Sequence, residues 1–90
     1  MELMQLEMFV AVVEEGGFQK AADRIFRTQP AVSLALSKLE QEVGIPLLKR
    51  EPKRSGGLTP AGEKLFKHAT RIIALRDEAL SLLKREKLRR

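Results

Sequence analysis

The 90-residue sequence has no cysteine, tryptophan or tyrosine, and four phenylalanines are its only aromatic residues. The absence of cysteine excludes a disulfide-bonded scaffold and thiolate metal sites. No apolar run approaches the roughly 20 residues that cross a bilayer as a helix. The N-terminus lacks the basic start and apolar stretch of a signal peptide. We therefore expect one cytoplasmic unit, with no membrane association, whose core is built from aliphatic side chains.

The sequence also lacks the residue sets that catalysis or cofactor binding would need. His68 is the sole histidine and has no cysteine or second histidine to complete a metal site. The serines have no histidine–acid relay, and the glycine pairs at 16–17 and 56–57 are typical of turns rather than of a phosphate-binding loop. We expect no enzyme activity, no metal and no cofactor. The place of His68 within an apolar stripe predicts that it packs.

Charge is unevenly distributed along the chain. Residues 1–48 carry four Lys/Arg and seven Asp/Glu, whereas residues 49–90 carry thirteen Lys/Arg and five Asp/Glu. A basic half favours a polyanion such as nucleic acid as partner. A solubilising surface with a basic tail is the alternative that charge alone leaves open.

Residues 28–44 predict a short helix whose first turns are presented to a partner. Thr28 is a suitable N-cap, Pro30 fits the first turn, and Gly44 ends the helix before Pro46. Four apolar residues at helical spacing predict one buried stripe: Val32, Leu36, Leu39 and Val43. Polar side chains at the start of the helix, outside this stripe, suit the base edges of a DNA major groove.

Two further helices precede this one, over residues 3–15 and roughly 18–26, with the turn at 26–28. Two short helices joined by a tight turn form a helix-turn-helix pattern, although the usual turn glycine is absent here. Residues 47–50 and 57–59 bracket a Pro/Gly/basic tip and predict a β-hairpin, or wing. Thr59-Pro60 then starts a final helix that reaches about residue 86, roughly 40 Å long at about 1.5 Å per residue.

These residues resemble the N-terminal domain of the LysR-type transcriptional regulators over residues 3–62. The resemblance is carried by Leu6, Phe9, Glu15-Gly16, Phe18, Ala21-Ala22, Thr28-Gln29-Pro30-Ala31-Val32-Ser33, Leu39-Glu40, Gly44, Leu47, Arg50 and Leu58-Thr59-Pro60-Ala61-Gly62. It implies an all-α fold with a small β-hairpin wing: a winged helix-turn-helix DNA-binding domain over residues 1–59 and a long linker and dimerisation helix with a basic tail over residues 60–90. It also implies bacterial transcription regulation, with a small-molecule effector only if a further C-terminal domain exists.

Nine residues form the expected contact set for a double-stranded DNA operator. They are Thr28, Gln29, Pro30, Ser33, Leu34, Lys38, Arg50, Lys53 and Arg54. Gln29 can pair with adenine through two hydrogen bonds, and the wing cations can hold phosphates or enter the minor groove. Leu34 departs from the basic or amide side chain common in the family. It could contact a thymine methyl, touch a partner, or weaken the readout.

The final helix carries a seam of residues that alternate by three and four. The expected homodimer interface comprises Leu65, Ile72, Leu75, Ala79 and Leu82, with His68 in the same row. An adjacent row holds Phe66, Ile73 and Leu80, so that one row can cover the core and the other can pair with a second copy. The alternative is a protein- or membrane-interaction module in which the basic amphipathic helix over 71–90 docks on a partner or an anionic surface.

Overall fold

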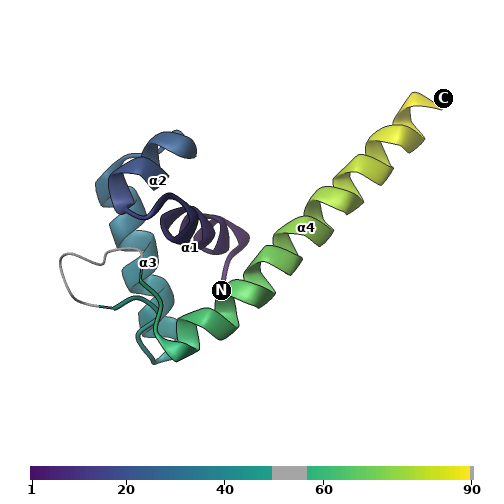
Figure 1. Ribbon diagram of the computed structural model, residues 1–90. Helices are drawn as coiled ribbons and strands as arrows, with labels where there is room; N and C mark the ends of the chain where they lie inside the picture. Colours follow the sequence, from purple (N-terminus) through teal and green to yellow (C-terminus); the bar gives the residue numbers. More distant parts are fainter. Residues whose placement is uncertain (50–56, 90) are drawn as a thin grey trace.

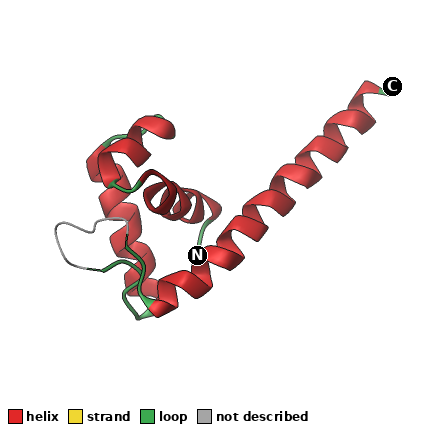
Figure 2. Ribbon diagram, viewed as in Figure 1, coloured by secondary structure: helices red, strands yellow, loops and turns green. Residues whose placement is uncertain are grey.

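The computed structural model describes residues 1–49 and 57–89, which form four helices. They are α1 (Leu3–Glu15), α2 (Phe18–Arg24), α3 (Gln29–Val43) and α4 (Pro60–Leu88). Helices α1 to α3 pack together, and α4 starts beside them and then projects away (Figure 1). Figure 2 shows the same arrangement coloured by secondary structure, with the red helices joined by green loops. The expected fold, helical with a winged helix-turn-helix arrangement, is confirmed.

The ends of α1 and α3 follow local capping rules. Gly16 and Gly44 adopt the left-handed conformation, with φ of 80° and 76°, directly after each helix. Their N–H groups donate to Val12 O and Glu40 O, both at 2.9 Å. A residue without a Cβ takes this conformation at little cost, which is why a glycine ends each helix where the sequence predicts.

The second helix is shorter than the 18–26 range predicted from its apolar spacing. It ends at Arg24, because Phe26 adopts a left-handed φ of 58° and directs the chain into the turn before α3. The Phe26 side chain is 93% exposed, so it does not continue the buried face of α2. A bulky residue therefore occupies the position where a helix-turn-helix ordinarily uses glycine.

The core lies where α1, α2, α3 and the first half of α4 meet. Its largest fully buried side chains are Phe9, Leu39, Leu47, Val12 and Val32. The predicted stripe of α3 is buried at Val32, Leu36 and Leu39, but Val43 is 38% exposed and the prediction for it was wrong. Val43 occupies the last turn of α3, beside Gly44, where the chain leaves the helix.

The predicted hairpin is seen at its base. Leu48 and Leu58 form an antiparallel bridge, Lys49 N–H donates to Gly57 O at 2.9 Å, and Thr59 N–H donates to Leu47 O at 3.0 Å. The rest of the predicted wing, including Arg50, Lys53 and Arg54, lies outside the described residues.

The hairpin base and the start of α4 are held in close contact. The Thr59 hydroxyl donates to Pro46 O at 2.7 Å and accepts from Gly62 N–H at 3.0 Å, so it both ties the chain and caps α4. A Cβ at Gly62 would lie 2.1 Å from Leu47 O. Only glycine permits this approach without a backbone shift.

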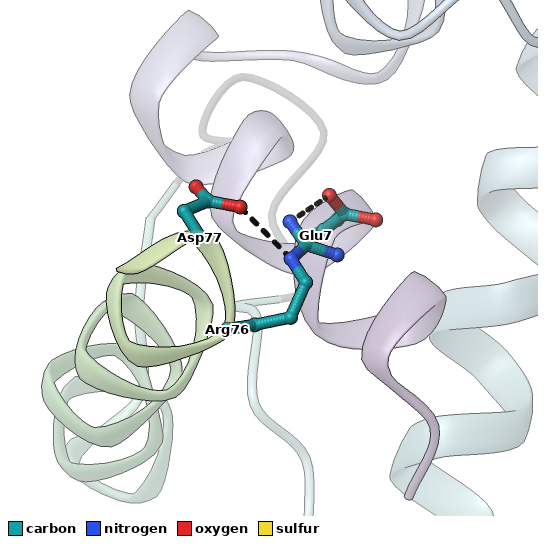
Figure 3. A network of polar contacts seen from close by, with 3 residues as sticks. All are labelled: Glu7, Arg76 and Asp77. Carbon is teal, nitrogen blue, oxygen red and sulfur yellow. Dashed lines mark hydrogen bonds and ion pairs between the residues drawn. The ribbon is translucent and has the colours of Figure 1, made fainter. Parts of the chain in front are cut away.

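The first half of α4 packs against α1. The Phe66 ring meets Phe9 edge to face, with ring centroids 6.4 Å apart, and Ala69 is fully buried. Further along, Arg76 donates to Glu7 at 2.7 Å and to Asp77 at 2.9 Å (Figure 3). The hydrogen bond to Glu7, ahead of the one to Asp77, raises the pKa of Arg76 above its ordinary value. Two contacts, one apolar and one ionic, thus fix the direction of α4.

Beyond Arg76 the described part of α4 is exposed at every residue, to Arg89. The helix extends slightly past the predicted end near residue 86. His68 is also exposed: its ring Nδ1 lies 2.9 Å from Lys64 O on the same helix. The expectation that His68 packs was wrong for the isolated chain, because the neighbouring row of α4 faces the core.

Candidate nucleic-acid interface

The start of α3 is built by its own residues. The Thr28 hydroxyl accepts from Ala31 N–H at 3.2 Å, as an N-cap should, and Pro30 occupies the first turn, where its missing N–H removes no helical hydrogen bond. Both residues are exposed. The turn before α3 and this cap fix which side chains the first turns of the helix present.

Gln29 and Ser33 form a directly bonded pair one helical turn apart. Gln29 Nε2 donates to Ser33 Oγ at 2.7 Å, and both residues are half-buried. One amide hydrogen is thereby used, while the second hydrogen and Oε1 remain available. A donor and an acceptor on one planar group match the N7 and N6 edge of adenine in the major groove.

The exposed face of α3 continues from this pair along the helix. Leu34 is 56% exposed, and Lys38 is exposed one turn further on. These positions lie on the opposite side of the helix from the buried Val32, Leu36 and Leu39. Of the six residues predicted from the sequence between Thr28 and Lys38, four are exposed, and Gln29 and Ser33 are half-buried.

No acidic side chain lies in the N-terminal half of α3. Glu40 is turned toward the backbone after the helix, where its carboxylate accepts from Leu47 N–H at 2.7 Å and Leu48 N–H at 3.1 Å. Glu42 pairs with the N-terminal ammonium group. Both carboxylates of α3 are engaged at the C-terminal end, so the presented end of the helix carries no negative charge that would repel phosphates.

Three cations lie on α2 and in the turn that follows it, close in sequence to the start of α3. Arg24 forms ion pairs with Glu14 at 2.8 Å and with Glu15 at 3.2 Å. The pKa of Arg24 is raised above its ordinary value, and the hydrogen bond to Glu14 is the largest cause. Lys20 and Arg27 are exposed, and among the described residues neither has an ion-pair partner. The structure thus leaves Lys20 and Arg27 accessible and engages Arg24 in the protein.

Two features near this surface were not predicted as site residues. Lys49 is exposed at the described end of the hairpin base, and Phe26 is exposed in the turn before α3. The basic run at 49–50 was a signal for Lys49. For Phe26 the signal was the bulky residue in the place of the usual turn glycine, which identifies the position but not the direction of the ring.

The predicted α4 seam is mostly accessible in the isolated chain. Leu75 is 64% exposed, Ile72, Ala79 and Leu82 are exposed, and Leu65 is half-buried against the core. In the adjacent row, Phe66 and Ile73 pack on the core, whereas Leu80 is exposed. One row of α4 therefore serves the core and the other is left apolar and open.

No described helix combines the length and apolar character needed to span a membrane. Residues 1–49 and 57–89 also hold no group of three or more histidine, cysteine or acidic side chains placed to bind a metal ion.

Residues 3–63 match the family described as bacterial regulatory helix-turn-helix proteins, lysR family. The chain is 48% identical over 81 residues to a probable RuBisCO transcriptional regulator of Cyanidioschyzon merolae, covering 90% of this chain and 26% of the regulator. It is 42% identical over 85 residues to the regulator BenM of Acinetobacter baylyi, covering 94% and 28% respectively. The chain thus spans about a quarter of the length of these two curated relatives.

Solved structures agree with this match. A crystal structure of the BenM DNA-binding domain with benA site 1 DNA superposes with a TM-score of 0.88 at 41% identity, covering 94% of both chains. A complex of the CbnR DNA-binding domain with DNA gives 0.85 at 34% identity, covering 96% of this chain and 98% of that one.

Proposed function

Because this chain belongs to the lysR family of bacterial regulatory helix-turn-helix proteins, we propose that it binds an operator in double-stranded DNA and thereby regulates bacterial transcription. Residues 1–59 supply the DNA-binding unit and residues 60–90 the pairing helix. The similar BenM and CbnR domains are described as DNA complexes, which supports DNA as the partner. A regulator that acts on the bacterial chromosome works in the cytoplasm.

The observation that carries this proposal is the oriented amide at the start of α3. The 2.7 Å hydrogen bond to Ser33 restrains the Gln29 side chain before any ligand arrives. A restrained side chain loses less rotamer entropy on binding, so more of its interaction with a base contributes to affinity. Gln29 reads adenine, and the Ser33 hydroxyl, whose hydrogen is not used in this bond, donates to a neighbouring base or phosphate.

Leu34 extends the readout with an apolar contact. It directly follows Ser33 on α3 and is more than half exposed. A leucine cannot hydrogen-bond, but it can pack on the C5-methyl group that thymine alone presents in the major groove. An adenine read by Gln29 with a thymine near Leu34 is therefore the preferred base pattern.

Contacts with DNA phosphates position α3 on the duplex. Lys38 is exposed on α3, and Arg50, Lys53 and Arg54 remain wing contacts predicted from the sequence. Each phosphate neutralised contributes about −0.9 to the slope of log K against log salt. These contacts raise affinity for all sequences, whereas the α3 side chains select among them.

Substitution of Gln29 by alanine tests the proposal. It should weaken binding to a selected cognate site by about 1–3 kcal/mol and relax the preference at one base pair, while the salt slope stays unchanged. Gln41→Ala on the last turns of the same helix is the matched control and should leave both properties intact. Fluorescence anisotropy with DNA selected from a random pool measures both. An unchanged consensus for the Gln29 variant would overturn the assignment.

We also propose that α4 pairs two copies as an antiparallel homodimer. In an antiparallel pair, seam positions from opposite ends face each other, which here sets Leu65 against Leu82, His68 against Ala79 and Ile72 against Leu75. His68, the polar residue of the seam, thus faces Ala79, which has the smallest side chain in the seam. Burial of the open aliphatic row contributes roughly 1.5–3 kcal/mol per fully buried side chain, enough for a few residues to offset the entropy of association.

The basic tail also fits a membrane or a partner groove, but none of the comparisons favours that function. Any response to a small-molecule effector would belong to residues beyond the family match at 3–63.

A further inference from the structure

We infer that Arg71 of one copy pairs with Glu78 of the second copy beside the seam of the antiparallel dimer. This inference rests on the pairing of α4 proposed above and adds a specific contact to it. The partner is a second copy of this chain, because these two opposite charges meet across the seam only when the second helix runs the opposite way.

Arg71 and Glu78 hold equivalent positions beside the seam. Each directly precedes a seam residue, Ile72 or Ala79, and they are seven residues, or two helical turns, apart. Both are exposed, on the side of the seam away from the core, since the other side carries Ala69 and Arg76, which face the domain. They are therefore placed to reach a second helix lying on the seam.

Neither charge is satisfied within the described chain. No ion pair involves Arg71 or Glu78, and no side chain of opposite charge lies three or four positions away on α4. Arg76, by contrast, is already held by Glu7 and Asp77. Arg71 and Glu78 are thus available for an intermolecular pair.

The antiparallel register brings them together twice. With Ile72 facing Leu75 of the second copy, the two-fold axis passes midway between residues 73 and 74. Position 71 then lies two residues, or about 3 Å along the helix axis, from the level of position 78 in the other copy. The two-fold symmetry repeats the contact, so one dimer contains two Arg71–Glu78 pairs.

A parallel pair would lose this complementarity. Flanking residues then meet across the seam five positions apart, which sets Arg71 against Arg76 of the second copy. The same arrangement would stack the two His68 rings against each other in the seam. At the centre of the seam, charge and shape both favour the antiparallel pair.

The ends of the seam supply an independent check. The same spacing that joins 71 to 78 sets Lys64 against Arg85 of the second copy, and these charges repel. Replacing Arg85 by glutamate would turn this repulsion into attraction in the antiparallel register. The wild-type helix pair is therefore supported at its centre and opposed at its ends.

Charge reversal tests the inference by sedimentation equilibrium of the full chain. Arg71→Glu and Glu78→Arg should each raise the dimer Kd by roughly tenfold to thirtyfold at low salt, since each turns two exposed attractive pairs into repulsive ones. The double variant Arg71→Glu/Glu78→Arg should return the Kd to near the wild-type value. In an equimolar mixture, the two single variants should associate with each other more tightly than either associates with itself. High salt should reduce these differences.

Two further variants separate the possible failures. Lys84→Glu changes net charge as much as Arg71→Glu but lies away from the seam, and it should leave the Kd unchanged. Arg85→Glu should lower it. If the double variant stays as weak as the singles and their mixture does not associate, the Arg71–Glu78 contact is refuted, while DNA binding by α3 is unaffected. If Ile72→Glu/Leu75→Glu remains dimeric, the seam itself is refuted, and with it this inference.

Discussion

Gly62 lies much closer to backbone atoms of another segment than Gly16 or Gly44 does, and its replacement by alanine has two opposing effects on stability. The residue lies in the first turn of α4, where alanine is favoured over glycine by up to about 1 kcal/mol of helix propensity. An added Cβ would meet Leu47 O at 2.1 Å, Leu47 C at 3.0 Å and Leu58 Cδ2 at 3.1 Å. The two nearer atoms belong to the backbone and cannot rotate away.

The magnitude follows from the distance that must be recovered. An ordinary C···O contact is about 3.3 Å or longer, so the start of α4 and the strand at Leu47 must separate by roughly 1 Å. Shifts of this kind in a packed core cost about 1–3 kcal/mol, more than the propensity gain. We expect Gly62→Ala to destabilise the protein by about 1–2 kcal/mol, which lowers the Tm by roughly 4–16 °C for a domain of this size.

Urea unfolding followed by circular dichroism, at one fixed protein concentration, measures this change. Ala74→Gly, at an exposed position of the same helix, calibrates the propensity term and should cost about 1 kcal/mol. A Gly62→Ala protein as stable as wild type, or more so, would show that the contact with Leu47 relaxes freely. The strand that leads into the wing would then not be fixed by α4.

Two other substitutions test local features of the fold. Glu40→Ala leaves the N–H groups of Leu47 and Leu48 without their carboxylate acceptor. Because both residues are buried, the variant should lose about 2–3 kcal/mol of unfolding free energy, measured by urea unfolding. A loss below about 0.5 kcal/mol would mean that water replaces the carboxylate. Phe26→Asn should stabilise the protein by about 1 kcal/mol in the same assay, because asparagine tolerates the left-handed conformation and no buried surface is lost. A decrease in stability would show that the ring packs.

Helix ends could be predicted from the sequence where the capping residues themselves fix the backbone. Thr28 and Thr59 cap α3 and α4, and Gly16 and Gly44 end α1 and α3, each as expected. The end of α2 could not be predicted in the same way. Phe26 has no intrinsic preference for a positive φ, and only the packing of α2 against α3 requires it there.

Which row of α4 faces the core could not be predicted either. Two rows of α4 have similar apolar periodicity. One row contains Leu65, His68 and Ile72, and the neighbouring row begins at Phe66. The choice is made by the close approach at Gly62 and by the Phe66 ring against Phe9, which are tertiary contacts between distant segments. His68 was expected to pack because its row could not be distinguished from the row that faces the core. Val43 was expected to be buried from its spacing alone, but it is the last residue of α3 and is 38% exposed.

The same docking of α4 links the two proposals. The Thr59 and Gly62 contacts and the Arg76–Glu7 pair hold α4 firmly to the domain that carries α3, so the register of two paired α4 helices sets the separation of two α3 helices. A slip of one heptad would move one domain by about 10 Å along the helix axis. That displacement equals about three base pairs of DNA, whose rise is about 3.4 Å. Because a dimer reads half-sites at a fixed spacing, the register of the seam, to which the Arg71–Glu78 pair contributes, sets which operator spacing can be bound, whereas Gln29 selects the base.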